Sequence, residues 1–82
     1  MSALQVLENT IRTEHHARAR EMAKAVCSVV DELLASGESP TVIHAEVQAL
    51  YDRYRSTGES VERDAMVEVL DWLEEEHPGE VG

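Results

Sequence analysis

The sequence contains no phenylalanine, and its aromatic residues are one tryptophan and two tyrosines. Hydrophobic residues still make up 43% of the chain, which is not the composition of a disordered protein. A buried core must therefore come mainly from Leu, Val, Ile, Met and Ala. A domain of 82 residues buries only about 60–65% of the surface of its unfolded chain. We expect one small core, which pairing between helices or between chains would stabilise.

Cysteine occurs once, at Cys27, so an internal disulfide is excluded. No stretch approaches the roughly 20 apolar residues of a membrane span, and residues 1–14 lack the basic start and apolar run of a signal peptide. These features predict a reducing, cytoplasmic location and no membrane partner. A glycine-rich phosphate loop, a Cys-x-x-Cys pair and strand-like alternation of apolar residues are also missing from the sequence.

Basic residues are scarce: 7 Lys and Arg stand against 17 Asp and Glu, for a formal net charge of −10. The imbalance disfavours direct binding to nucleic acid or anionic membranes, and it favours basic partners or simply solubility. Acidic residues also accumulate along the chain. Four basic residues face three acidic ones over residues 1–24, two face five over residues 25–58, and one faces nine over residues 59–82.

Two short polar segments divide the chain, and each contains a glycine with a serine two residues later. Gly37 and Gly58 suit the left-handed position just past a helix end. Ser39 and Ser60 can each cap the helix that follows. The segments therefore predict two helix-to-helix turns.

Apolar residues at steps of three and four predict helices over about residues 3–35, 40–55 and 61–76. Pro78 stops the last helix, and residues 77–82 are expected to form a frayed C-terminal tail. The predicted fold is all-α, with a single helical domain over residues 1–76. It is a three-helix bundle, or a long helix plus a helical hairpin, and we expect it to dimerise.

The expectation of a dimer comes from unequal helix lengths. A helix over residues 3–35 would be about 50 Å long, whereas its two successors are half that length and cover only its C-terminal half. Leu4, Leu7 and Ile11 would then form an exposed apolar stripe, best covered by a second copy of the chain. The alternative is a break near Thr10 that lets residues 3–9 fold back over the core. Both alternatives remain open at this point.

Histidines and the single cysteine are the candidates for chemistry. A helical metal site needs ligands three or four residues apart, and no ligand lies at that spacing from His15 or His16. Cys27 has no histidine at that spacing to act as a base. We therefore expect no enzyme activity, no metal and no cofactor.

An acidic run surrounds Trp72 near the end of the third predicted helix. Such a run is either a solvated face or a docking surface for a basic partner, with Trp72 or Leu73 as an apolar anchor. The predicted function is a non-catalytic adaptor or inhibitor that binds a basic protein surface, including one that otherwise binds nucleic acid. The alternative is a homodimeric bundle that serves as a structural or regulatory assembly subunit. The predicted partner-binding residues are Leu4, Leu7, Ile11, His15, Arg18, Asp71, Trp72, Glu74, Glu75 and Glu76.

Overall fold

The structure is a computed structural model, and it describes residues 2–15 and 17–76. Within these residues the chain forms helices α1 (Ala3–Thr13), α2 (Ala19–Ala35), α3 (Pro40–Thr57) and α4 (Ser60–Glu76). The described residues contain no strand, so the prediction of an all-α fold is confirmed. The expected frayed tail over residues 77–82 lies outside the described residues.

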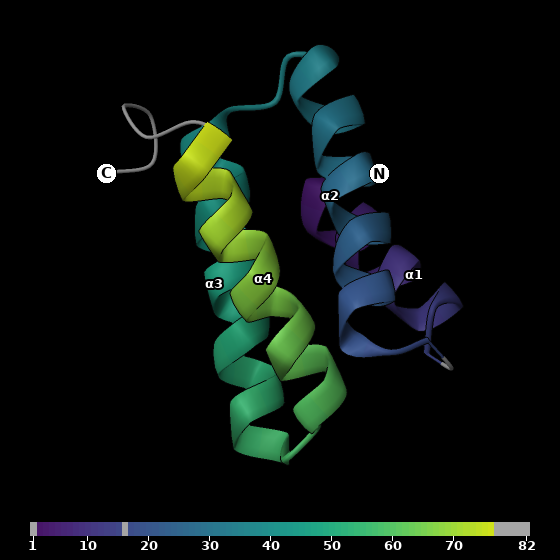
Figure 1. Cartoon of the computed structure of the whole chain (residues 1–82). Helices are drawn as coiled ribbons and strands as arrows, with labels where there is room; N and C mark the ends of the chain where they lie inside the picture. The colour runs from purple at the N-terminus through teal and green to yellow at the C-terminus, as the bar shows by residue number, and fades with distance from the viewer. Residues whose placement is uncertain (1, 16, 77–82) are drawn as a thin grey trace.

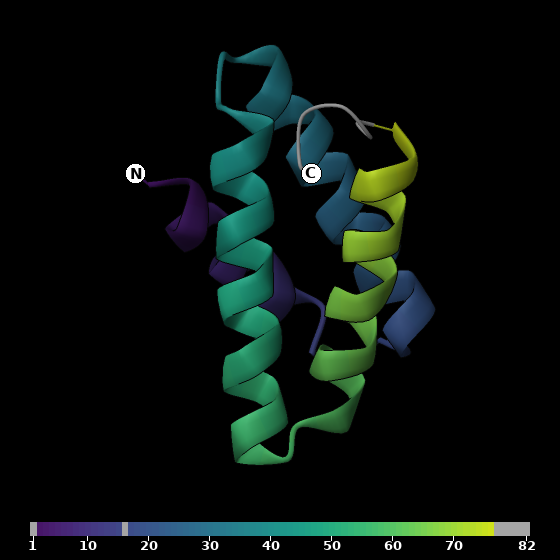
Figure 2. The ribbon, with the colours of Figure 1, turned by 90° about the vertical axis from the view of Figure 1, so that its left-hand side faces the viewer.

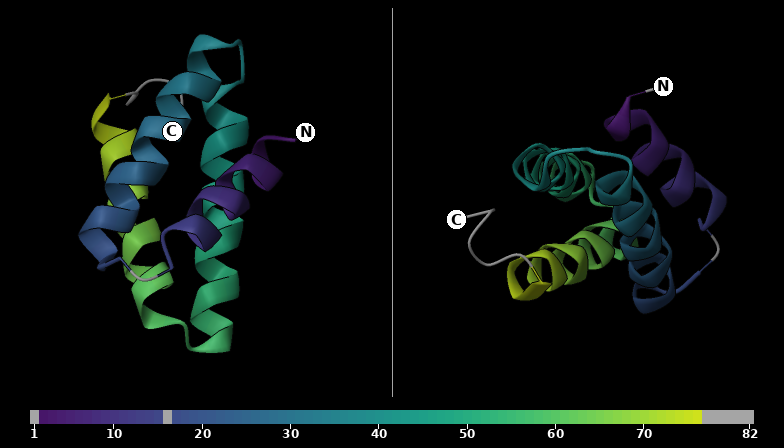
Figure 3. Two further views of the ribbon diagram at one scale, coloured as in Figure 1. Left: turned by 90° about the vertical axis from the view of Figure 1, so that its right-hand side faces the viewer. Right: turned by 90° about the horizontal axis from the view of Figure 1, so that it is seen from above.

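Helices α2, α3 and α4 run up, down and up along a common direction (Figure 1). Helix α4 packs against both α2 and α3, and Figure 2 shows α3 and α4 side by side, joined by a tight turn. Helix α1 packs against α2 and α3 on the side away from α4. It crosses α3 at a steep angle (Figure 3, left). Seen from above, α1 and α4 therefore lie on opposite sides of the α2–α3 pair (Figure 3, right).

The continuous helix expected over residues 3–35 is wrong. Helix α1 ends at Thr13 with Glu14 as its C-cap residue, and α2 begins after Arg18, whose backbone is extended (φ −72°, ψ 161°). Thr10 and Thr13 do not cap a new helix, because their hydroxyls donate to carbonyls four residues back, at 3.0 and 2.9 Å. The alternative prediction, in which the helix breaks and its first part folds back over the core, is correct. The break, however, comes several residues after Thr10.

The break has a simple physical cause. Apolar positions stop after Ile11, and His15 and Arg18 occupy the places where a continuous stripe would need apolar side chains. An unbroken helix would leave Leu7 and Ile11 in water. Reversing the chain buries both, at 0% and 4% exposure, and burying such a side chain contributes roughly 1.5–3 kcal/mol.

The core contains one aromatic side chain, Tyr54, among aliphatic and methionine side chains. Each of the four helices contributes at least two buried residues to it. The largest fully buried side chains are Leu7, Met22, Ile43, Leu50, Met66, Leu73, Val26, Val30, Val47 and Val69. The core is thus built from the residue types that the composition predicts.

The two predicted glycine turns are present. Gly37 and Gly58 have φ of 105° and 77°, in the region that side chains disfavour. The serine caps are less regular than expected. Ser39 is the N-cap residue of α3 but makes no side-chain cap hydrogen bond, and Ser60 already lies inside α4.

Candidate functional site: the charged surfaces of the bundle

The apolar stripe of α1 is not available to a partner. Leu7 and Ile11 are buried in the core, and Leu4 is half-buried and packed against it. The prediction that these three residues form an exposed surface is therefore wrong, because α1 folds back over its own core. The argument for a homodimer that rested on this stripe loses its support.

His15 and Arg18 lie in the turn between α1 and α2, and both are exposed. Nδ1 of His15 is 2.9 Å from the carbonyl oxygen of Arg12. Since a carbonyl oxygen can only accept, Nδ1 carries the proton in that hydrogen bond. This turn and the C-terminal end of α4 lie at opposite ends of the molecule (Figure 1). The structure therefore does not bring His15 and Arg18 together with the acidic residues of α4.

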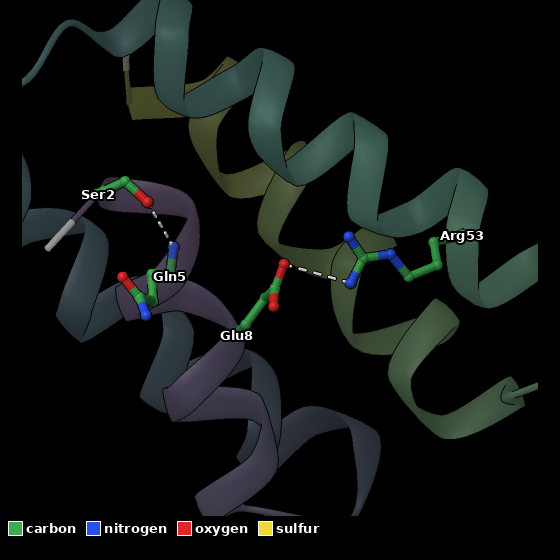
Figure 4. Close-up of polar contacts among 4 residues, drawn as sticks. All are labelled: Ser2, Gln5, Glu8 and Arg53. Carbon is green, nitrogen blue, oxygen red and sulfur yellow. Dashed lines mark hydrogen bonds and ion pairs between the residues drawn. The ribbon is translucent and has the colours of Figure 1, made fainter.

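An ion pair ties α1 to α3. Nη1 of Arg53 donates to Oε1 of Glu8 at 3.2 Å (Figure 4). The two side chains are 52% and 29% exposed, so the pair contributes only about 0.2–1 kcal/mol. It was not foreseen from the sequence, because its members are 45 residues apart and follow no helical spacing.

A cavity lies beside this ion pair, bordered by residues of α1, the end of α3 and the start of α4. Its volume is about 370 Å³. Carboxylates and guanidinium groups share its walls, which are lined by Glu8, Ile11, Arg12, His15, Arg53, Tyr54, Thr57, Glu59 and Glu62. Burial raises the pKa of Tyr54; Arg53 lowers it, and Glu59, Glu8 and Glu62 raise it. The cavity is thus polar, with charges of both signs.

Acidic residues gather at the other end of the molecule. The C-terminal ends of α2 and α4 lie there with the N-terminal end of α3, at the top of Figure 1. This acidic end comprises Asp31, Glu32, Glu38, Glu46, Asp71, Glu74, Glu75 and Glu76. Residues 25–50 and 67–76 contain no lysine or arginine, because all 7 lie within residues 12–24 and 53–63. The fold therefore sorts the charges in space.

The four predicted carboxylates of α4 are all exposed in the acidic end. Glu46 belongs to the same end, although no pattern in the sequence distinguishes it. Its Oε2 is shielded from solvent and has no hydrogen-bond partner among the described residues. Burial, and then the charge of Glu38, raise the pKa of Glu46. The carboxylates of Glu38 and Glu46 thus repel each other within the acidic end.

A smaller groove of about 290 Å³ separates α2 from α4. It is lined by Arg20, Ala23, Lys24, Cys27, Glu68 and Trp72. Trp72 is half-buried there, whereas Leu73 is fully buried and cannot anchor a partner. Of the two apolar anchors predicted from the sequence, only Trp72 is therefore partly exposed.

Cys27 is a half-buried free thiol in this groove. Burial raises its pKa to about 11, with Asp31 and Glu68 adding to the effect. The thiol is therefore protonated at neutral pH. Since the thiolate is the reactive form, the environment of Cys27 suits packing rather than nucleophilic attack.

Comparison with protein-family models, with curated proteins and with solved structures gave no match to this chain. In the part of the chain that the structure describes, no three of His, Cys, Asp and Glu are placed to hold a metal ion. No helix there is both long and apolar enough to cross a membrane. The argument for function therefore rests on the geometry of this chain's own residues.

Proposed function

We propose that the protein is a non-catalytic interaction module, an adaptor or inhibitor that binds a basic protein surface through its acidic end. The carrying observation is that eight carboxylates from three helices and one loop belong to segments at one end of the bundle, without a lysine or arginine among them. Potentials of one sign on such a surface attract an oppositely charged partner and orient it. The exposed apolar stripe expected on α1 contributes nothing to this proposal.

Sorting of charge favours this role over solubility alone. Solubility depends on net charge and requires no separation of the signs over the surface. Here all lysines and arginines lie outside the acidic end, within residues 12–24 and 53–63, where carboxylates accompany them. A basic surface that otherwise holds nucleic acid is a suitable target, because it already carries groups placed to meet closely spaced negative charges.

The test compares two charge-matched variants. One reverses Glu74, Glu75 and Glu76 to Lys at the acidic end, and the other reverses Glu14, Glu21 and Asp52, which lie outside it. Both change the net charge equally. A partner captured from the host lysate is identified by mass spectrometry, purified, and its affinity measured at about 50 and about 200 mM salt.

We expect the acidic-end variant to bind this partner roughly 10- to 100-fold more weakly, and the matched variant to bind nearly as the parent does. Affinity of the parent falls as salt rises. Equal effects of the two variants, or an affinity that is insensitive to salt, would overturn the proposal.

A homodimeric assembly subunit is the second candidate, and the outer face of α3 is the observation that favours it. Val42 is 46% exposed, and Ala45 and Ala49 are exposed at the following positions of the same face. Small side chains allow two helices to approach closely. Val42→Lys would then convert a dimer to a monomer in sedimentation experiments, and a parent protein that is monomeric at all concentrations removes this candidate.

A further inference from the structure

The groove between α2 and α4 offers a site for an apolar side chain. Ala23 and Cys27 of α2 line one wall, and Trp72 of α4 lines the other. Its volume of about 290 Å³ lies at the lower limit of sites that hold drug-sized ligands, which is roughly 300–1,000 Å³. The space therefore suits one protein side chain better than a small molecule.

Charge is distributed unevenly along this groove. Asp31 lies one helical turn beyond Cys27 on α2, and Glu75 lies nearly one turn beyond Trp72 on α4. Both belong to the acidic end. Arg20 and Lys24 line the opposite part of the groove. Glu68, which also lines the groove, lies one helical turn before Trp72 on α4. A segment lying in the groove would thus find carboxylates alone at one end, and two cations with one carboxylate at the other.

We propose that this groove extends the acidic end and receives an apolar side chain of the basic partner, next to lysines or arginines that contact Asp31 and Glu75. The inference rests on the proposed function and adds what the partner segment must contain. Exposed charge pairs at a rim orient a partner but contribute little affinity, whereas an apolar side chain in a desolvated pocket supplies it. Arg20 and Lys24 outnumber Glu68 in the opposite part of the groove, so the cations of the segment are favoured beside Asp31 and Glu75.

The chain provides its own reporters for the test. Its single tryptophan and its single cysteine both line the groove. The probes are two synthetic peptides of lysine and alanine with equal charge, one with a central leucine and the other with serine in its place. Binding is followed by Trp72 emission and by the rate of Cys27 alkylation, and affinity is measured by calorimetry.

We expect the leucine peptide to bind roughly tenfold more tightly than the serine peptide. It should also shift Trp72 emission and slow alkylation of Cys27. Trp72→Ala should reduce the ratio of the affinity for the leucine peptide to that for the serine peptide. Circular dichroism checks that this variant is folded, and the comparison of the two peptides on the parent protein does not depend on it.

Two negative results have different meanings. Equal affinities for the two peptides, with unchanged Trp72 emission, would overturn the groove as a docking site but leave charge-driven binding at the acidic end intact. Failure of both peptides to bind at about 50 mM salt would count against the proposed function and, with it, against the groove.

Discussion

Nη1 of Arg53 and Oε1 of Glu8 lie 3.2 Å apart and join α3 to α1. Besides the apolar core, this ion pair is a polar link between α1 and another helix. A double-mutant cycle with Arg53→Ala and Glu8→Ala should give a coupling energy of about 0.2–1 kcal/mol, because both side chains are partly solvated. Urea denaturation measures it. A coupling near zero would mean that the pair does not form in solution.

Because Leu7 is buried, we expect its truncation to lower the free energy of unfolding by more than loss of the ion pair does. Leu7→Ala removes a side chain with 0% exposure and should lower the free energy of unfolding by about 2–5 kcal/mol. Leu4→Ala, at a half-buried position of the same helix, serves as the matched control and should cost less. Thermal or urea denaturation checks both. If α1 were detached from the core, the two variants would each change stability by no more than about 0.5 kcal/mol.

The environment of Glu46 should make the free energy of unfolding depend on pH. Because its pKa is raised in the folded state, the charged form is disfavoured by folding. The stability linked to this group is fully present below the unfolded pKa and is lost as pH rises through the folded pKa. Glu46→Gln should therefore stabilise the protein at neutral pH, and the gain should disappear in acid. Denaturation curves at several pH values measure it, with Glu32→Gln as an exposed control; a gain that persists in acid would contradict the explanation.

Cys27 should react slowly with alkylating reagents. With its pKa raised to about 11 from an ordinary thiol value of 9.0, the thiolate fraction at pH 8 falls by about a hundredfold. The alkylation rate of the folded protein should be lower by that factor than the rate in urea, and should rise about tenfold per pH unit up to pH 10. Asp31→Asn removes a charge that raises this pKa and should speed the reaction. A rate independent of pH would contradict this.

The sequence predicted α3 and α4 well because the signals for them are local. Apolar spacing, Pro40 and the left-handed glycines Gly37 and Gly58 act within a few residues of each helix end. The break between α1 and α2 is different. Helical spacing is compatible both with one long helix and with two helices, and the choice depends on whether Leu7 and Ile11 find a core to enter. That is decided by packing over the whole chain.

The candidate site was predictable in part for the same reason. The excess of acid near Trp72 is visible in the sequence, and it lies in the acidic end as exposed carboxylates. The participation of Glu38 and Glu46 depends on how α3 is placed beside the ends of α2 and α4. The groove at Trp72 likewise needs Ala23 and Cys27 of a different helix. Contacts between distant segments of this kind carry no signal in the spacing of residues.

The separation of the acidic end from the lysines and arginines gives the molecule a permanent electric dipole along its bundle axis. In the field of a positively charged body, a dipole experiences a torque before any contact is made, so the protein would rotate and arrive acidic end first. This pre-orientation acts over about 10 Å at 0.1 M salt. Added salt would consequently slow the encounter itself while leaving the lifetime of a formed complex much less affected.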